Sequence, residues 1–323
     1  MIASDNGFGS IGRWTKAAIV LALLGASIGS AAGAPVNLED KTLFHREHAV
    51  GGRFSFIAGP LIYQDRDSER YTRGYRPKAQ SVVSGTRWRE VYDYPSDYMA
   101  YGVYEAVTER LVEAGYESVY ACRRRACGDV AGWRLYIGPR ADGSPAHQYY
   151  FLGRAESDGE VAAPHVAVYV NELDGQPRVI LDYAVPEWGY ESAQGGADGA
   201  GGPVGEPVFF SKGASHVAGR FDARLRAIAE RAGRLGDGGR LVVVGHSDRD
   251  GDLLTNICLS NQRALSVRDA LVREYGVNRE AVIAMGMGAL IPRGASMAEN
   301  RRVEVIAAGA DTGAMVGMAD GPR

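Results

Sequence analysis

The sequence has almost no net charge and no long run of like charges. Lys and Arg number 36 and Asp and Glu 39, which leaves a net charge of −3 over 323 residues. A protein that binds nucleic acid through a strong positive field needs a basic excess, and a charged interaction tail needs a run of one sign. We therefore expect no nucleic-acid partner.

Several motifs that carry chemistry are also missing. The sequence has no phosphate-binding P-loop or dinucleotide fingerprint, and the glycines of residues 195–202 follow no strand. His246, Ser247 and Asp248 are catalytic residue types, but sequence neighbours do not form a triad, and there is no nucleophile-elbow motif. Residues 248–259 begin like a calcium loop, yet glycine stands fourth instead of sixth and Leu259 replaces the final Glu. We predict no enzyme activity, no cofactor and no metal site.

The first residues have the pattern of an export signal. Arg13 and Lys16 precede the apolar run of residues 17–24, and small residues continue to Ala34. A cleavable secretory signal combines these features, so we predict a signal peptide at residues 1–34. The alternative is an uncleaved membrane anchor, because residues 17–38 contain no charge.

The sequence contains only three cysteines. Cys122 and Cys127 are separated by four residues, and an oxidising compartment favours a structural disulfide between them. The alternative role, as two zinc ligands, lacks a second Cys or His pair at suitable spacing. Cys258 has no partner and lies in an apolar helical pattern, which predicts a buried thiol.

Glycine and tyrosine divide the chain into domains. There are 43 glycines without the three-residue repeat of collagen, and seven of the nineteen residues 188–206 are glycine. Sixteen of the 17 tyrosines precede residue 191. We predict a domain at residues 35–187, a Gly-rich linker at 188–206, a second domain at 207–307 and a flexible tail at 308–323.

The first domain is predicted to be α+β, with one main helix and an antiparallel sheet. Met99, Val103, Val107 and Leu111 recur at helical spacing, with Ser96 as the expected cap and Gly115 as the stop. Strand-like segments follow at residues 116–122, 133–137, 148–154, 165–171 and 178–184, the last two joined by a hairpin at 173–176. Its tyrosines are interpreted as sheet packing.

The second domain is predicted to have the order βαβαββ, with two helices packed on a mixed sheet. Strands are expected at residues 208–210, 241–244, 282–285 and 303–306. The first helix face carries Val217, Phe221, Leu225 and Ile228. Ser260 is expected to cap a second helix with a face of Ala264, Val267, Leu271 and Tyr275.

Asp248 and Arg263 form the candidate binding site. Asp248 follows the predicted strand 241–244, and Arg263 would occupy the third position of the helix capped by Ser260, where a cation opposes the helix dipole. Arg263 with free helix N–H groups would bind a carboxylate, and Asp248 would bind an ammonium group. The two residues together predict a zwitterionic amino-acid ligand. The alternative is that they pair with each other and fix the loop.

Three motifs in this region resemble the OmpA-like (OmpA/MotB C-terminal, Pal-like) peptidoglycan-binding domain over residues 207–307. They are Gly245-His-Ser-Asp248, then Asn256-x2-Leu259-Ser260-x2-Arg263-Ala264, and Asn300-Arg301-Arg302-Val303-Glu304-Val305. The resemblance implies that Asp248 and Arg263 bind the amino-acid end of diaminopimelate in the peptidoglycan stem peptide. It implies lesser contacts from Asn256 and the Gly251 backbone, and support of the pocket rim by Arg301 or Arg302.

This chain departs from the pattern at two places. Residues 210–213 lack the acidic residue usual after the first strand, and the loop at 288–300 is short, so we expect binding weaker than is typical of the family. Residues 45–185 resemble exported domains of unknown function that are often fused to an OmpA-like module. The cues are Ala114-Gly115, the Cys122 to Gly128 segment and Trp133. No known activity comes with that resemblance.

The resemblance implies a non-catalytic periplasmic protein of a Gram-negative cell envelope, associated with the outer membrane. Its partner would be peptidoglycan, and the first domain would contact a further envelope protein. Two alternatives remain: a cell-envelope enzyme with its chemistry in the Tyr-rich domain, and a structural protein anchored in the inner membrane through residues 17–38.

Overall fold

The computed structural model describes residues 36–64, 74–156, 162–187, 203–235 and 239–308. The predicted signal peptide, most of the linker and the tail beyond Ala308 lie outside these ranges. None of the helices within them combines the length and hydropathy that a membrane span requires. The linker's last residues are described: Val204 is buried, and its N–H donates to the carbonyl of Val305 at 2.6 Å.

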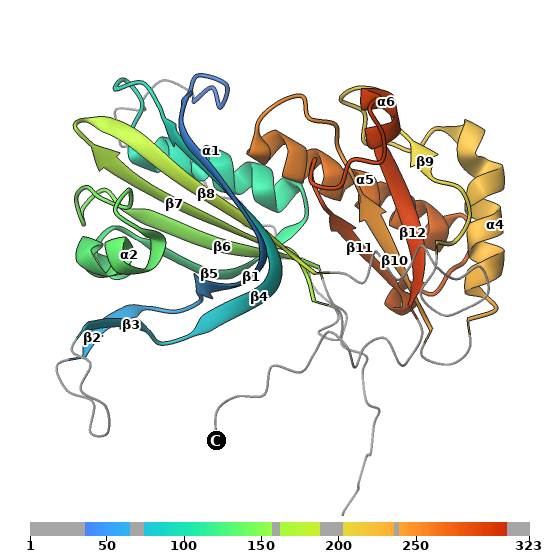
Figure 1. Cartoon of the computed structure of the whole chain (residues 1–323), viewed down its shortest axis with the longest axis horizontal. Helices are drawn as coiled ribbons and strands as arrows, with labels where there is room; N and C mark the ends of the chain where they lie inside the picture. The colour runs from blue at the N-terminus through green and yellow to red at the C-terminus, as the bar shows by residue number, and fades with distance from the viewer. Residues whose placement is uncertain (1–35, 65–73, 157–161, 188–202, 236–238, 309–323) are drawn as a thin grey trace, which may run out of the picture. The chain divides into compact units, whose positions relative to one another are not determined.

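The first half is built on a six-stranded antiparallel sheet, as predicted (Figure 1). Its order is β1-β4-β8-β7-β6-β5. The strands are β1 (Thr42–Ile57), β4 (Gln80–Asp93), β5 (Tyr116–Arg123), β6 (Tyr149–Ala155), β7 (His165–Leu173) and β8 (Gln176–Pro186), beside a separate pair of β2 (Leu61–Gln64) and β3 (Gly74–Pro77). The expected β7–β8 hairpin is present, with Asp174 and Gly175 both at positive φ. Positive φ at both turn residues matches the twist of the strands.

The sequence did not predict β1 to β4. β1 carries polar and charged side chains from His45 to His48, and most of its residues are exposed or half-buried. A strand of this kind lacks the apolar run or strict alternation that marks a buried strand. Its position is set by the long antiparallel pairing with β4.

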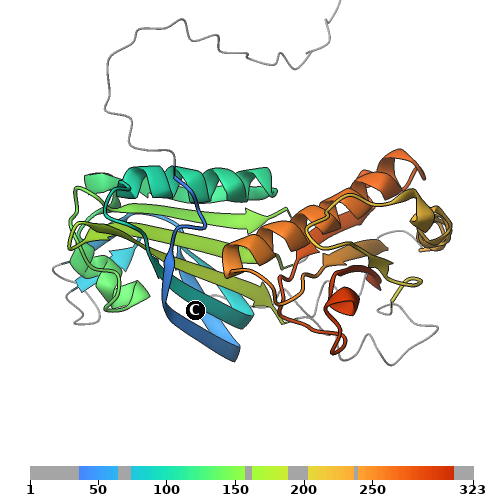
Figure 2. The ribbon, with the colours of Figure 1, turned by 90° about the horizontal axis from the view of Figure 1, so that it is seen from above.

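The main helix, α1 (Ala100–Glu113), covers one face of the sheet (Figure 2). Val103, Val107 and Leu111 are buried in the cluster that also holds Val166 and Leu181 of the sheet. Gly115, at φ 94, follows the helix end as predicted. The expected cap at Ser96 is wrong: the helix begins after Met99, whose side chain makes no capping bond.

The predicted strand at residues 133–137 is also wrong, because Val130–Ile137 form the helix α2. The Asp129 side chain caps it by accepting a hydrogen bond from the Ala131 N–H at 3.0 Å. Trp133 is fully buried, and its indole N–H donates to the Cys127 carbonyl at 2.9 Å. A short apolar run does not distinguish strand from helix, and here the Asp cap and the Trp133 anchor decide.

The second half has the predicted βαβαββ order and a mixed sheet, β11-β10-β12-β9. β10 and β11 are parallel, and the other pairs are antiparallel. The main elements are β9 (Val208–Phe209), α4 (Asp222–Ala232), β10 (Arg240–Gly245), α5 (Leu253–Arg273), β11 (Val282–Gly286) and β12 (Arg302–Ala308), with the short helix α6 (Met297–Asn300) before β12. Both long helices pack with β10 and β12 in one buried apolar cluster (Figure 1).

Helix α5 begins seven residues before the predicted cap. Asp252 is the N-cap, and its carboxylate accepts the Thr255 N–H at 2.7 Å. Ser260 therefore lies inside the helix, where its hydroxyl donates to the Ile257 carbonyl and accepts the Gly288 N–H. Asp252 acts as the cap because its backbone is extended there and its side chain reaches the first turn.

The two halves share buried contacts within the single unit Gly33–Arg323. One apolar cluster contains Leu111 and Leu181 together with Val244, Ile257 and Met285. Hydrogen bonds also join the two halves in this region. The Asn261 amide donates to the Ala114 carbonyl at 2.8 Å, and the Glu90 carboxylate accepts the Leu253 N–H at 3.1 Å. The linker is therefore not the sole connection between the two halves.

Two glycines let α5 lie directly on the ends of β10 and β11. A Cβ at Gly245 would stand 2.0 Å from the Ser260 carbonyl oxygen, and one at Gly286 would stand 2.4 Å from the Asn261 nitrogen. We expect Gly245→Ala to lower the unfolding free energy by about 1 to 3 kcal/mol, because backbone must separate to admit the methyl group. Urea unfolding followed by circular dichroism measures this. Gly219→Ala is the control, because its Cβ would have no neighbour nearer than 4.0 Å; equal losses in both variants would contradict the prediction.

Candidate functional site

The candidate site is formed where three segments of the second half meet. The segment after β9 supplies residues 211–214, the loop after β10 supplies residues 246–252, and α5 supplies Arg263. Arg301, just before β12, completes the group. The backbone joins these segments: the N–H of Phe210 donates to the Arg301 carbonyl, and that of His246 to the Arg302 carbonyl, both at 2.8 Å.

Asp248 and Arg301 form an ion pair at this site. Nη1 of Arg301 lies 2.8 Å from Oδ2 of Asp248, and the side chains are 16% and 8% exposed. The other carboxylate oxygen accepts the Asp250 N–H at 3.2 Å. Nε of Arg301 donates to the Phe210 carbonyl at 3.2 Å. Arg301 therefore links Asp248 to the segment that follows β9.

Arg263 is fully buried beside this pair, and each guanidinium nitrogen donates to a backbone carbonyl. Nε bonds to Ala214 at 2.8 Å, Nη1 to His246 at 2.9 Å and Nη2 to Ser211 at 3.3 Å. The guanidinium carbon lies 5.3 Å from the centroid of the Phe210 ring. Burial lowers the pKa of Arg263 to about 10, the charge of Asp248 opposes this shift and the charge of Arg301 adds to it. Arg263 is still protonated at neutral pH.

The expectation that Arg263 lies in the first turn of its helix is wrong. It is the eleventh residue of α5, so it lies far from the helix N-terminus and its free N–H groups. The alternative, a mutual Asp248–Arg263 pair, is not what the structure shows either. Asp248 pairs with Arg301, and Arg263 bonds to carbonyl oxygens. The site nevertheless brings Asp248, Arg263 and Arg301 together.

The other predicted residues have different surroundings. Gly251 turns the loop at φ 87, and Asn256 is buried in the first turn of α5. Arg302 is fully buried, with Nε 3.0 Å from the Glu304 carboxylate and both Nη atoms 3.3 Å from the Ile291 carbonyl. It therefore fixes residue 291 of the loop before β12, whereas Arg301 contacts Asp248.

Sequence reasoning missed the segment after β9. Its carbonyls at Ser211 and Ala214 hold Arg263, and Lys212 forms an ion pair with Asp250 at 2.9 Å. The Lys212 and Asp250 side chains are 76% and 48% exposed, so this pair lies at the surface above the buried Arg263 contacts. Carbonyl acceptors leave no residue-type signal, which is why the sequence did not reveal them.

A second buried group lies next to the site. His246 is 1% exposed, with Nε2 3.5 Å from the Glu304 carboxylate. Burial lowers the pKa of His246, although Glu304 opposes this shift. For Glu304, burial raises the pKa, but its contacts with His246 and Arg302 outweigh burial and hold the pKa well below its usual range. The neighbouring Ser247 hydroxyl is buried and has no hydrogen-bond partner among the described residues.

The electrostatics of the site favour a ligand with both charges. Asp248, Arg263 and Arg301 carry a summed charge of +1, from two guanidinium groups and one carboxylate. The guanidinium groups are donors suited to a carboxylate, and the aspartate is an acceptor suited to an ammonium group. A small zwitterion whose two charges lie on one carbon matches this arrangement.

A mixed four-stranded sheet with two long helices, and charged loops after its strands, defines the fold of this half. Residues 209–305 match the OmpA family model, and this segment is an OmpA-family domain. No curated protein matches the chain.

Three solved structures are similar to part of this chain. The peptidoglycan-associated lipoprotein from Burkholderia pseudomallei is 26% identical, with 31% of this chain and 88% of that chain covered and a TM-score of 0.29. The C-terminal domain of Helicobacter pylori MotB is 21% identical, with 34% and 91% covered and a TM-score of 0.31. The cell wall anchor of the T6SS from Pseudomonas aeruginosa is 24% identical, with 49% and 87% covered and a TM-score of 0.27.

We expect Arg301→Met to destabilise the domain by about 2 to 3 kcal/mol, because it leaves the shielded Asp248 carboxylate without its cation. Arg301→Lys is the matched control and should lose less, since it keeps the charge. Urea unfolding at neutral pH measures both variants. Wild-type stability in Arg301→Met would contradict the prediction.

We expect acid to weaken the fold through His246. Because burial lowers its pKa below the ordinary value of 6.5, the unfolded chain binds more protons than the folded chain as the pH falls through that value. The unfolding free energy should therefore decline from about pH 7 to about pH 5, and less steeply in His246→Gln. His165, whose pKa burial also lowers, retains part of the decline in the variant. Urea unfolding across this range tests the slopes, and identical slopes would exclude His246 as the source.

Proposed function

We propose that this protein binds peptidoglycan non-covalently through its OmpA-family domain and catalyses no reaction there. The ligand is the free amino-acid end of diaminopimelate in the stem peptide. The observation that carries the proposal is the grouping of Asp248, Arg263 and Arg301, one carboxylate beside two guanidinium groups. The resemblance of the motifs around Asp248 and Arg263 to peptidoglycan-binding domains supports the same ligand.

The hydrogen-bond capacity of the site leaves room for this ligand. The Asp248 carboxylate accepts two bonds, from Arg301 and Asp250, and a carboxylate has about four acceptor positions. Arg263 uses three of its N–H groups on carbonyls, out of the five that a guanidinium carries. The ligand ammonium would bind Asp248, and the ligand carboxylate would bind the arginines.

Access to Arg263 requires a movement of the segment after β9. Arg263 is fully buried, whereas the side chain of Arg301 is 16% exposed. The ligand carboxylate would meet Arg301 first and would reach Arg263 when residues 211–214 shift and the surface pair Lys212–Asp250 separates. That pair is well exposed, so its separation costs little.

Such a site gives modest affinity for one stem peptide. Each charge-assisted hydrogen bond contributes about 1.5 to 3 kcal/mol, and association consumes several kcal/mol of the total. Peptidoglycan offers many identical stem peptides, so a bound protein rebinds a neighbouring one. The proposal places the protein in the periplasm of a Gram-negative envelope, associated with the outer membrane, after removal of residues 1–34. The first half would contact a further envelope partner.

Co-sedimentation with purified peptidoglycan tests the proposal. Asp248→Asn keeps the shape of the side chain and removes its charge, and we expect retention to fall at least about tenfold, the effect of losing one charge-assisted bond. Asp174→Asn is the control: it removes one charge at an exposed hairpin turn whose positive φ Asn also tolerates. Circular dichroism confirms that both variants are folded.

The polymer provides a second test. Peptidoglycan in which lysine replaces diaminopimelate lacks the free carboxylate, so it should retain the protein poorly. Full retention of Asp248→Asn on the diaminopimelate polymer would overturn the assignment of the binding site to Asp248. Equal retention of the wild type on both polymers would overturn diaminopimelate as the ligand.

A further inference from the structure

A short loop of the first half presents three consecutive arginines. Arg123, Arg124 and Arg125, which we call the arginine loop, lie between Cys122 and Cys127, and all three are exposed. The two cysteines form the predicted disulfide, with their Cα atoms 5.0 Å apart. None of these residues belongs to the OmpA-family segment, so the proposed wall binding does not involve them.

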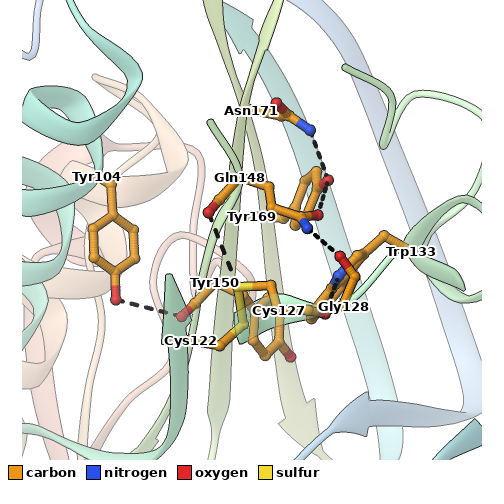
Figure 3. The surroundings of a disulfide bond; sticks show 9 residues. All are labelled: Tyr104, Cys122, Cys127, Gly128, Trp133, Gln148, Tyr150, Tyr169 and Asn171. Carbon is orange, nitrogen blue, oxygen red and sulfur yellow. Dashed lines mark hydrogen bonds between the residues drawn. A yellow bond between two sulfur atoms is a disulfide. The ribbon is translucent and has the colours of Figure 1, made fainter. Parts of the chain in front are cut away.

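Figure 3 shows the buried hydrogen bonds and the disulfide that hold the end of the loop at Cys127 and Gly128. The Trp133 indole donates to the Cys127 carbonyl at 2.9 Å, and the Gln148 amide donates to the Gly128 carbonyl at 2.5 Å. Gln148 in turn accepts a hydrogen bond from the Tyr169 hydroxyl at 3.2 Å. The disulfide and these buried contacts join the loop to α2, β6 and β7. The backbone of the arginine loop is therefore ordered before any ligand binds.

The arginine side chains are also supported. The Arg123 guanidinium lies 5.6 Å from the ring centroid of Tyr101 and 5.7 Å from that of Tyr104, and it donates to Glu105 at 2.8 Å. Arg124 donates to the Tyr149 hydroxyl at 3.4 Å. Supported arginines lose less conformational entropy on binding than free ones.

Arg124 has an unusual backbone conformation. Its φ is 54°, in the left-handed region that costs a residue with a side chain of order 1 kcal/mol. Glycine would remove that cost, yet the position carries an arginine. The disulfide and the bond from the Arg124 N–H to the Gln148 carbonyl hold the residue there. The result is three consecutive, exposed arginines at one tight turn.

The charges and neighbours of the loop indicate its partner. Among the described residues, Glu105 is the carboxylate that pairs with these arginines, so the three arginines and Glu105 sum to a charge of +2 on a chain of net charge −3. Exposed side chains with apolar surface lie on or next to helix α1: Tyr101, which contacts Arg123, is 39% exposed, and Met99, the residue before the helix, is 51% exposed. Guanidinium groups beside exposed aromatic and apolar side chains suit the interface of an anionic membrane.

We propose that the arginine loop, with Tyr101 and Met99, docks on the surface of a membrane that contains anionic phospholipid. The guanidinium groups bind lipid phosphates, for which arginine provides paired donors, while Tyr101 and Met99 enter the headgroup region. The contact is peripheral and reversible, because two side chains bury little apolar area.

Vesicle co-sedimentation of the exported chain, from which residues 1–34 have been removed, tests this proposal. The vesicles contain equal parts of phosphatidylglycerol and phosphatidylcholine. We expect Arg124→Gln/Arg125→Gln to partition about 30-fold more weakly than the wild type, because each basic residue near such a surface contributes about 1 kcal/mol. Arg226→Gln/Arg231→Gln is the matched control, since it removes the same charge from exposed positions on α4 and should bind as the wild type does.

Four further measurements decide the outcome. Binding that is lost in high salt and absent on pure phosphatidylcholine supports the proposal. A loss in Cys122→Ser/Cys127→Ser, with the circular dichroism spectrum unchanged, supports the role of the ordered loop. No binding by the wild type, or equal losses in the two arginine variants, would overturn the proposal. Displacement by millimolar inorganic phosphate at constant ionic strength would assign the loop to a free phosphate ion and overturn the membrane surface as its partner.

Discussion

The binding region depends on one buried cation. The Arg263 guanidinium is fully buried, and its desolvation is offset by three carbonyl acceptors, the face of Phe210 and the nearby charge of Asp248. Because a guanidinium is planar, acceptors on its three nitrogens must lie near one plane, which fixes the segment after β9 relative to the loop after β10. Lys212 lies on the first of these segments and Asp248 and Asp250 on the second, and Arg301 contacts both sides through the Phe210 carbonyl and Asp248. The same carbonyls that stabilise Arg263 also restrict ligand access to it, so stability and binding are linked at this residue.

Arg263 reaches the two loops because α5 lies unusually close to the sheet. Gly245 and Gly286 have no side chain to separate the strands from the helix, and Ser260 and Asn261 fill that contact. The same part of α5 continues the packing into the first half. The Asn261 amide accepts the Gly286 N–H and donates to the Ala114 carbonyl. One turn of α5 therefore takes part both in the core of the OmpA-family domain and in the contact between the halves.

The sequence predicted the parts of this structure that depend on apolar periodicity. Leu241 to Val244, the face of Ala264, Val267 and Leu271, and the β7–β8 hairpin were identified because their patterns are local. Ser96 and Ser260 have a capping residue type but do not cap α1 or α5, since such residues are common and only the backbone conformation selects the one that caps. Asp248 lies near enough to Arg263 to act on its charge, but the contacts that place Arg263 are with main-chain carbonyls. Every residue has a main-chain carbonyl, so the sequence does not show which ones accept these hydrogen bonds. The sequence does not predict β1 and β4, because many of their residues are charged and partly exposed. Their strand conformation depends on pairing between segments that are distant in the sequence.

The shared core changes how the two halves can act together. A flexible linker would let a wall-binding domain and a second binding surface search independently, with an effective concentration set by linker length. Here an apolar cluster and buried hydrogen bonds join the halves, so the distance between a wall contact and any contact of the first half is set by packing. Simultaneous binding then costs little additional entropy when wall and partner lie at the matching separation, and is excluded at other separations. Under the proposed functions, such a chain would bind best where the wall and the partner of the first half lie at that separation.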